Sequence, residues 1–353
     1  MTRTTVCTRP FRAMGPRLEV EQIGAQTVVH NYGHGGSGWS LSWGSSGIAV
    51  RYALATGVRD LAVIGCGALG LTSAILAQRA GLRVTIYAKE RPPDVRSSLA
   101  TGLWTPDSRI CLEENATPEF KQSWEAMART SFATYQNYMN LPDAPVEWID
   151  NYTLSGGEPH LLSAPPSASP PRFAELRQEL IPDLSMRLER LPPERNPFPT
   201  PYAVRTSVMM FNITEYTSVL MAEFFRNGGV IETRSFETPS QFSQLAQQTL
   251  INATGYGAKA LFRDDAITPV RGQLARLMPQ PDLHYGVLYD RVLMVPRRDG
   301  IVVQALGGDE GFGFGDDSTA PDERQALAAV QTIADLSARM QRFSQAARSR
   351  FTS

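Results

Sequence analysis

A short apolar run followed by glycines predicts the first set of elements. Residues 61–64 are continuously apolar, which is typical of a strand buried in a parallel sheet. Residues 65–70 then carry glycine at their first, third and sixth positions, and residues 71–80 have a helical pattern that Gly81 ends. Residues 83–87 read as a second strand. We expect this strand, turn, helix and strand to present helix N–H groups to the pyrophosphate of a nucleotide.

The remaining apolar periodicity predicts helices over 119–140, 214–227 and 322–346, and a strand over 250–255 that ends in a turn. Helices that alternate with short apolar strands are typical of an α/β protein. At 353 residues, the chain is long enough for two domains or one large two-part unit.

A second cluster of glycines lies upstream, in the segment HNYGHGGSGWSLSWG at residues 30–44. Gly33, Gly35, Gly36 and Gly38 fall within six residues. Glycine adopts positive φ at little cost and lets backbone N–H groups approach a ligand closely. The two clusters together indicate a dinucleotide. The alternatives are a structural glycine hairpin for residues 30–44 and an ordinary strand–helix turn for residues 65–70.

Composition narrows the partners and the cellular setting. The net charge of −1 gives no electrostatic reason to expect nucleic acid or an anionic membrane as partner. No apolar run approaches the ~20 residues that cross a bilayer. Cys7, Cys66 and Cys111 are too few and too scattered for a disulfide framework or a zinc site, so we expect no metal and a cytoplasmic location. The basic start of the chain, where Glu19 is the first acidic residue, also fits an organellar transit peptide.

Several segments resemble the D-amino-acid oxidase family of FAD enzymes. The family's first βαβ unit is similar to AVIGCGALGLTSAILAQRAGLRVTIYAKE, and its next FAD-contacting stretch is similar to SSLATGLWTP. LINATGYGAKAL and ITPVRGQLARL resemble a later turn and the strand that follows it, and RPFRAMGPRLEVEQ with VVHNYGHGGSGWSLSWG looks like the family's C-terminal segment. The resemblance implies an α/β fold with a Rossmann-type FAD-binding domain and an antiparallel-sheet substrate domain.

The order of these segments differs from that of the family. The family opens on the GxGxxG strand and closes on HNYGHGG, whereas the closing segment comes first here, at roughly residues 5–56. The resemblance therefore implies a circularly permuted chain, which is physically acceptable because sheet pairing depends on position in space. We expect residues 18–106 with 200–256 to form the FAD-binding domain. Residues 107–199 with 257–345 would form the substrate domain, with residues 1–17 contributing at the active site.

The resemblance also implies that FAD is the cofactor and which residues hold it. These are Gly65, Gly67, Ala68, Leu69 and Gly70 at the pyrophosphate, Lys89 or Glu90 at the adenosine ribose, Ser97, Ser98, Gly102, Leu103 and Thr254 beside the phosphates and flavin, and Gly35, Gly36, Ser37, Gly38, Trp39 and Ser40 along the flavin. Glu90 is favoured over Lys89 because a carboxylate accepts hydrogen bonds from both ribose hydroxyls, although the two also fit a solvated surface pair.

Backbone N–H groups of the glycine segment would stabilise the negative charge of the reduced flavin and raise its potential. His30 and His34 belong to the same motif in the family as packing and cofactor-contacting residues. We therefore assign neither of them a role in proton transfer.

Three residues match positions that bind substrate in the family. Arg9 in CTRP matches an arginine that binds the substrate carboxylate, a pairing that a guanidinium makes bidentately. Tyr289 in LYDRVLMVP matches one active-site tyrosine, whereas Leu293 stands where the family has a second. Ser37 also replaces a bulkier residue, so we expect an altered pocket. The alternatives are a solvated Arg9 and a packing role for Tyr289.

The reaction implied is the oxidation of a C–N bond in an amino acid or related amine, with hydride transfer from the α-carbon to flavin N5. The products are an imine or 2-oxo acid, with oxygen reduced to hydrogen peroxide, and no side-chain base is required. The substrate classes left open are D-amino acids, glycine or sarcosine, and a tailored amino acid of a biosynthetic pathway. The other functional classes are an NAD(P)-dependent dehydrogenase and a non-catalytic flavin-binding protein. A homodimer is implied by family analogy alone.

Overall fold

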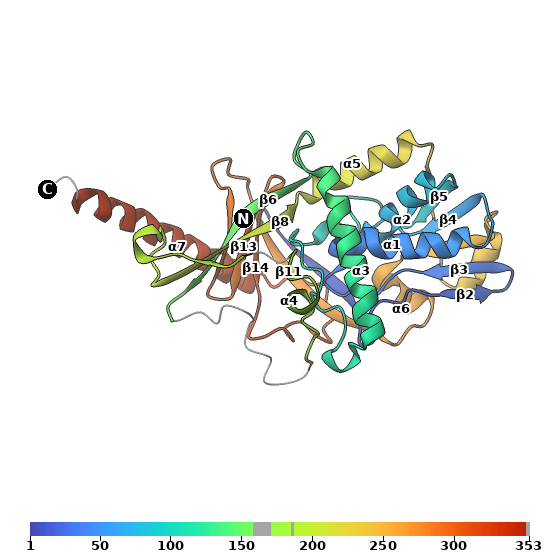
Figure 1. Cartoon of the computed structure of the whole chain (residues 1–353), viewed down its shortest axis with the longest axis horizontal. Coiled ribbons are helices and arrows are strands. Elements are labelled where there is room, and N and C mark those ends of the chain that lie inside the picture. Colours follow the sequence, from blue (N-terminus) through green and yellow to red (C-terminus); the bar gives the residue numbers. More distant parts are fainter. Residues whose placement is uncertain (158–170, 185–186, 351–353) are drawn as a thin grey trace.

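Two β-sheets form the framework of the molecule, with helices packed against both (Figure 1). The structure is a computed structural model that describes residues 1–157, 171–184 and 187–350. Part of the 107–199 range expected for the substrate domain lies outside these residues. In Figure 1 the six-stranded sheet lies on the right and the eight-stranded sheet near the centre, with α7 extending away on the left.

The six-stranded sheet has the order β2-β3-β10-β4-β5-β9. Its strands are β2 Val20–Ile23, β3 Gln26–His30, β10 Thr249–Asn252, β4 Asp60–Ile64, β5 Arg83–Ala88 and β9 Val230–Thr233. Five strands are mutually parallel, and β2 is antiparallel to β3. The central strands are buried on both faces, which explains their continuously apolar sequences.

The eight-stranded sheet has the order β1-β11-β14-β13-β12-β6-β8-β7. Its strands are β1 Arg3–Arg12, β11 Ile267–Leu277, β14 Gly300–Ala305, β13 Val292–Arg297, β12 Tyr285–Tyr289, β6 Val146–Ser155, β8 Tyr202–Phe211 and β7 Glu189–Arg190. All neighbours are antiparallel except β12 and β6. The chain thus has the two sheets of the α/β fold expected from the sequence.

The helices are α1 Gly38–Leu54, α2 Ala68–Arg79, α3 Pro118–Tyr135, α4 Arg177–Leu180, α5 Ile213–Arg226, α6 Ala258–Leu261 and α7 Glu323–Arg350. Of the helices in the described residues, α1 and α2 pack on the six-stranded sheet, α7 packs on the eight-stranded sheet, and α3 and α5 pack on α1 and α2. Short 3₁₀ turns span Arg96–Leu99, Glu113–Asn115, Gln136–Tyr138, Pro193–Arg195, Pro239–Gln244 and Gly255–Gly257. None of the helices among the described residues combines the length and the apolarity needed to cross a membrane.

α1 packs between α2 and α3, and small residues make the close approach possible. A Cβ on Gly44 would lie 2.2 Å from the carbonyl oxygen of Met127 in α3. The close approach of α1 and α3 therefore requires glycine at position 44. Along the α2 side, Ser46 Oγ lies 2.8 Å from Thr72 Oγ1. The buried serines of α1 and Gly44 are therefore interface residues of a tightly packed helix layer.

The structure confirms the predicted strands at β4 and β5 and the predicted helices at α2, α3, α5 and α7, with bounds shifted by a few residues. It adds α1, which the sequence analysis treated only as a glycine-rich segment. It also places residues 202–211, which the expected boundaries grouped with the FAD-binding domain, in the eight-stranded sheet, where β8 pairs with β6. The three cysteines are free thiols.

Candidate active site

Residues from both sheets line one cavity of about 780 Å³. We call residues 64–69, 87–90 and 253–257 the Rossmann end, because they lie at or just beyond the carboxyl ends of β4, β5 and β10 in the six-stranded sheet. The sheet end consists of residues 6–10, Gly272, Leu274, Leu293 and Gln304, with Thr105, Ser108 and Arg109 beside them. The glycine segment 34–40 and the segment 95–103, apart from Ser37 and Ser98, line the cavity between the two ends.

At the Rossmann end, three glycines shape the turn from β4 into α2. Gly65 has φ +107°, and a Cβ there would lie 2.6 Å from the carbonyl oxygen of Ala253. A Cβ on Gly70 would lie 2.0 Å from the carbonyl oxygen of Gly65, so Gly70 serves the close packing of α2 on β4 and does not line the cavity. Gly67, Ala68 and Leu69 line it. Of the N–H groups in the first turn of α2, which have no intrahelical partner, that of Leu69 is left for a ligand at the cavity, because the N–H of Ala68 donates to Ser97 Oγ.

The segment 97–103 connects the two sheets around the cavity. Ser97 Oγ accepts a hydrogen bond from the N–H of Ala68 at 3.1 Å, and the Ser97 carbonyl accepts one from Trp39 Nε1 at 2.8 Å. Two buried arginines of the eight-stranded sheet donate hydrogen bonds to carbonyl oxygens further along this segment. Arg276 Nη2 donates to the carbonyl of Ser98 at 3.1 Å, and Arg297 Nη1 donates to the carbonyl of Ala100 at 2.7 Å.

These contacts bring Ser97 to the cavity while Ser98 stays outside it. Gly102 and Leu103 complete the cavity-lining part of the segment. Gly102 has φ +95°, and its carbonyl accepts a hydrogen bond from the N–H of Phe211 in β8 at 2.7 Å.

The glycine segment has its N–H groups arranged differently from our expectation. The N–H groups of Gly35 and Gly36 donate to the carbonyls of Pro10 and Ser108, both at 2.9 Å, and the N–H of Ser37 donates to His34. Ser37 is buried and its hydroxyl also donates to Ser108, so it does not line the cavity. The donors left for a ligand are those of Gly38, Trp39 and Ser40, the first turn of α1.

Three further expected cofactor residues lie at the Rossmann end. Lys89 and Glu90 follow β5 and both line the cavity. Thr254 follows β10 and also lines it. Its N–H and hydroxyl donate to Asn252 Oδ1 at 3.2 Å and 2.7 Å, which fixes the Thr254 side chain.

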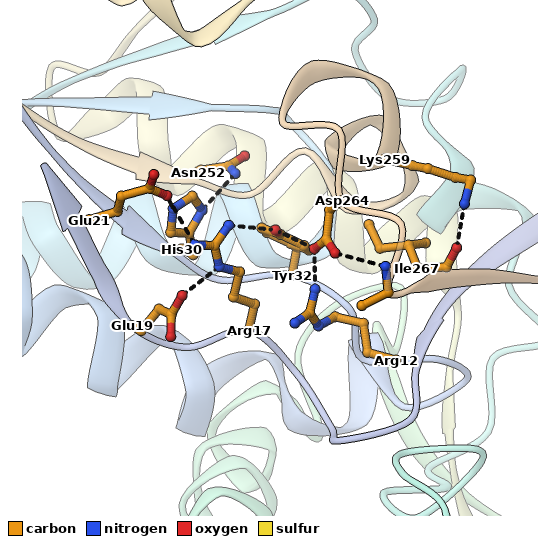
Figure 2. Close-up of polar contacts among 11 residues, drawn as sticks. Arg12, Arg17, Glu19, Glu21, His30, Tyr32, Asn252, Lys259, Asp264 and Ile267 are labelled. Atoms are coloured by element: carbon orange, nitrogen blue, oxygen red, sulfur yellow. Dashed lines mark hydrogen bonds and ion pairs between the residues drawn. The ribbon is translucent and has the colours of Figure 1, made fainter. Parts of the chain in front are cut away.

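Figure 2 shows the network of hydrogen bonds and ion pairs that fixes the side chain of Asn252. Asn252 Nδ2 lies 3.1 Å from His30 Nδ1, and His30 Nε2 lies 2.9 Å from Glu21 Oε2. Burial, and secondarily the positive charge of Arg17, lowers the pKa of His30 to about 4, so the imidazole is neutral at pH 7. It donates through Nε2 and accepts through Nδ1. His30 is thus a structural residue that positions Thr254 through Asn252.

The same network anchors the turn before β11. Tyr32 Oη donates to Asp264 Oδ2 at 2.7 Å and accepts from Arg17 Nη1 at 3.2 Å, and Arg12 forms an ion pair with Asp264 (Figure 2). Burial raises the pKa of Tyr32 to about 12. The first half of HNYGHGG therefore packs, and the second half lines the cavity. His34 is fully buried, which lowers its pKa to about 3.

At the sheet end, Arg9 extends from β1 across β11. A Cβ on Gly272 would lie 2.6 Å from Arg9 Nη2 and 2.8 Å from its Cζ, so the guanidinium occupies the space that a side chain there would fill. Arg9 Nη1 lies 3.4 Å from the carbonyl oxygen of Arg271. Burial lowers the pKa of Arg9, and within the described parts of the chain it forms no salt bridge. Its charge is thus available to an anionic ligand.

Leu293 and Gln304 are cross-strand neighbours on β13 and β14, and both line the cavity. Gln304 Oε1 accepts from Thr101 Oγ1 at 2.7 Å. Tyr289 is not brought to this site. Strand alternation turns its side chain to the opposite face of the sheet, where it packs near α7 and its hydroxyl accepts from Arg339 Nη2 at 2.7 Å.

The cavity is rich in positive charge. Its cationic lining residues are Arg9, Lys89, Arg96, Arg109 and Arg234, whereas Glu90 is the one acidic residue among the lining residues that the structure describes. Sequence reasoning missed Arg96, Arg109, Arg234 and Gln304. Arg96 directly precedes the matched SSLATGLWTP stretch, and this adjacency was its one available signal.

FAD fits this donor set. Its pyrophosphate and its reduced flavin carry negative charge, and the cavity offers them the N-termini of two long helices, α1 and α2, together with the cationic side chains. Gly65 and Gly67 leave the backbone uncovered where a phosphate would approach.

Comparisons with known proteins agree with this reading. Residues 60–351 match the family described as FAD dependent oxidoreductase (DAO). A D-amino-acid oxidase of Rubrobacter xylanophilus is 27% identical over 79% of this chain and 77% of the relative, and one of Dictyostelium discoideum is 25% identical over 78% and 72%.

Among solved structures, glycine oxidase from Geobacillus kaustophilus is similar in fold, with a TM-score of 0.54 and 14% identity over 81% of this chain and 80% of that one. A family defined by FAD excludes the alternative of an NAD(P)-dependent dehydrogenase. The chain belongs to the D-amino-acid oxidase family and is an FAD-dependent oxidoreductase.

Proposed function

We propose that this protein oxidises the C–N bond of an amino acid or related amine whose carboxylate binds Arg9. The observation that carries the proposal is the position of Arg9, a half-buried guanidinium without a salt bridge in the described part of the chain, in the same cavity as the two helix N-termini. An enzyme of this kind must hold a carboxylate at one end of its site and a dinucleotide at the other.

Arg9 would orient the substrate by a bidentate, charge-assisted pair with its carboxylate. Because Gly272 lets the guanidinium lie against β11, the carboxylate position is defined by the strand as well as by the side chain. Leu293 and Leu274 supply apolar contacts, and Gln304 supplies a neutral polar one.

Residues of the Rossmann end and of both helix N-termini would hold FAD. We assign the pyrophosphate to Gly65, Gly67, Ala68 and Leu69, and the ribose to Glu90. The flavin would lie beside Ser97, Gly102, Leu103 and Thr254 and receive the N–H groups of Gly38, Trp39 and Ser40. When bound, FAD supplies the acceptor for the hydride that leaves the α-carbon.

Catalysis in this proposal depends on position and electrostatics and uses no side-chain base. Glu90, the acidic lining residue, belongs to the Rossmann end, and His34 has its ring nitrogens buried. The substrate must therefore release the proton of its ammonium group to solvent before the hydride leaves. We expect oxygen as the final electron acceptor and hydrogen peroxide as its product.

Anaerobic reduction of the bound flavin tests the proposal. D-amino acids, L-amino acids and N-alkyl glycines are mixed one by one with the purified holoprotein under nitrogen, and the visible flavin absorbance is followed. We expect at least one class to bleach the flavin, and admission of oxygen to restore the colour with formation of peroxide. A yellow protein that none of them bleaches would be a non-catalytic flavin-binding protein.

We also propose that the chain is a circular permutant of the family. The family match begins at residue 60, yet residues 1–59 supply β1, β2, β3 and α1 and carry Arg9 and the glycine segment. A reordered chain, with residues 60–350 first and residues 1–56 attached after α7 by a long flexible linker, should bind FAD with unchanged stoichiometry. A reordered chain that folds but binds no FAD would contradict the proposal.

A further inference from the structure

Two arginines lie close to the glycine segment at the sheet end of the cavity. Arg9 precedes Pro10, whose carbonyl accepts the N–H of Gly35, and Arg109 follows Ser108, whose carbonyl accepts the N–H of Gly36, both at 2.9 Å. Both arginines line the cavity. Arg109 has φ +50°, a conformation that costs a non-glycine residue free energy, so its backbone is held by its surroundings.

The positive charges of these arginines are not balanced locally. Neither forms a salt bridge within residues 1–157, 171–184 and 187–350. Arg9 is within reach of the Arg271 carbonyl at 3.4 Å, and Arg109 Nε donates to the Glu310 carbonyl at 2.9 Å. Burial, and next the charge of Arg9, lowers the pKa of Arg109 to about 10. The side chains of Asp309 and Glu310 partly offset this repulsion, but neither lines the cavity.

A ligand with one carboxylate would neutralise one of these charges and leave the other. Two like charges in a partly buried site repel each other more strongly than they would in water, and pairing each with an anion removes that cost. Guanidinium groups bind carboxylates in a planar, bidentate arrangement, so two of them favour two separate acid groups over one.

We propose that the substrate carries two acidic groups, an α-carboxylate that binds Arg9 and a second acid that binds Arg109. The class includes amino acids with an acidic side chain and amines that carry two carboxymethyl groups. This inference rests on the proposed function, because it extends the same site by one residue.

The competing role for Arg109 is structural. Its guanidinium lies over the ring of Phe173, with Cζ 5.7 Å from the centroid, and Phe173 packs against Phe11 and Phe314. Through Glu310, Arg109 also contacts the loop that leads from β14 toward α7. An arginine that only fastened this loop would affect every substrate equally.

The experiment compares each acid with its own amide in the holoenzyme. kcat/KM is measured for aspartate against asparagine and for glutamate against glutamine, in both stereoisomers. We expect the diacid to be preferred by about 10- to 100-fold, the usual value of a hydrogen-bonded charged pair. In Arg109→Gln the ratio of the two kcat/KM values should fall toward one, and Arg109→Lys should restore part of it. Arg298→Gln, which removes an exposed arginine paired with Glu147 outside the cavity, is the matched control.

A second measurement does not require turnover. Succinate and its monoamide, succinamate, are titrated into the holoenzyme, and the shift in Tm and in the flavin spectrum is recorded. Succinate should bind more tightly by a similar factor, and Arg109→Gln should abolish the difference.

The outcomes separate the two proposals. Equal binding of succinate and succinamate by the unmodified protein, or an equal loss for diacid and monoamide in Arg109→Gln, would overturn the diacid assignment. If no amine reduces the flavin but succinate still binds preferentially through Arg109, the proposed oxidase function fails and the diacid site stands.

Discussion

The two ends of the cavity are built from different parts of the polypeptide. At the Rossmann end and in the adjoining glycine segment the ligand-facing groups are largely backbone: the Gly65–Gly67 turn and the first turns of α2 and α1. At the sheet end they are side chains from separate strands, including Arg9 on β1 and Gln304 on β14. A backbone site depends on one local conformation, whereas a side-chain site depends on the register of several strands. The first is sensitive to glycine replacement and the second to single side chains.

Replacing Gly65 should have the largest effect. Gly65→Val places a Cβ 2.6 Å from the Ala253 carbonyl oxygen and forces a branched residue to φ +107°, so the turn cannot keep its shape. We expect the purified variant to lose its FAD, measured as the ratio of flavin to protein absorbance. Full flavin content in this variant would contradict a backbone-built Rossmann end.

Gly47 in α1 is the matched control for that substitution. No atom lies within 4 Å of a Cβ built there, and its φ is not positive. Gly47→Ala should keep all of its FAD and gain about 0.5–1 kcal/mol of stability, because alanine loses less backbone entropy in a helix.

Acid should destabilise the folded protein through two buried histidines, His30 and His34. The pKa values of His30 and His34 are lowered to about 4 and about 3, so the unfolded chain, with histidine pKa near 6.5, binds protons that the folded one does not. This contribution to stability is fully present above pH 6.5 and declines as the pH falls. At pH 5 each histidine should cost about 2 kcal/mol, seen as a lower Tm than at pH 7.5. His284→Asn, which alters an exposed histidine, should leave this pH dependence unchanged.

Removing the Arg9 guanidinium should affect substrate binding and not the cofactor. Arg9→Gln is expected to lower kcat/KM for a carboxylated substrate about 100-fold, because a charged hydrogen-bonded pair is lost. Arg9→Lys should recover only part of this, since an ammonium does not bind a carboxylate bidentately. A substrate ester, which lacks the carboxylate, should be affected little. An equal loss for acid and ester would remove Arg9 from carboxylate binding.

Gly272→Ala sharpens the comparison with a smaller change. The new methyl would lie 2.6 Å from Arg9 Nη2, and the long arginine side chain can shift away from it. We expect KM to rise up to about 10-fold, which corresponds to roughly 1.4 kcal/mol, with full FAD content. Gly308→Ala, where no atom lies within 4 Å of the new Cβ, is the control and should not change KM.

The difference between the two ends also decides what could be predicted from the sequence. The strand, glycine turn and helix around Gly65 are contiguous, so their pattern predicted β4, α2 and β5. α1 was missed because serines and glycines pack its interfaces and leave no apolar stripe. The N–H groups of Gly35 and Gly36 were assigned to the ligand because their carbonyl partners, Pro10 and Ser108, lie far away along the chain.

The residues of the sheet end were harder to predict from the sequence than those of the Rossmann end. Tyr289 was expected at the site, but the alternation of β12 directs it toward α7, while Leu293 on the neighbouring strand does line the cavity. Only the pairing register of the strands distinguishes the two faces. No sequence pattern identifies Arg109 as a cavity residue. It lies close to the glycine segment only in the folded chain, where the N–H of Gly36 donates to the carbonyl of Ser108.

A chain of hydrogen bonds runs from Glu21 through His30 and Asn252 to Thr254, and it determines which kind of ligand atom can bind the Thr254 hydroxyl. Since His30 donates to Glu21, its Nδ1 can only accept, and Asn252 must turn its amide nitrogen toward it. Asn252 Oδ1 then accepts a hydrogen bond from the Thr254 hydroxyl. The hydroxyl oxygen can therefore act toward the cavity only as a hydrogen-bond acceptor. The carboxylate of Glu21, which does not line the cavity, thus fixes the direction of every hydrogen bond as far as Thr254. A ligand atom that binds the Thr254 hydroxyl must therefore be a hydrogen-bond donor.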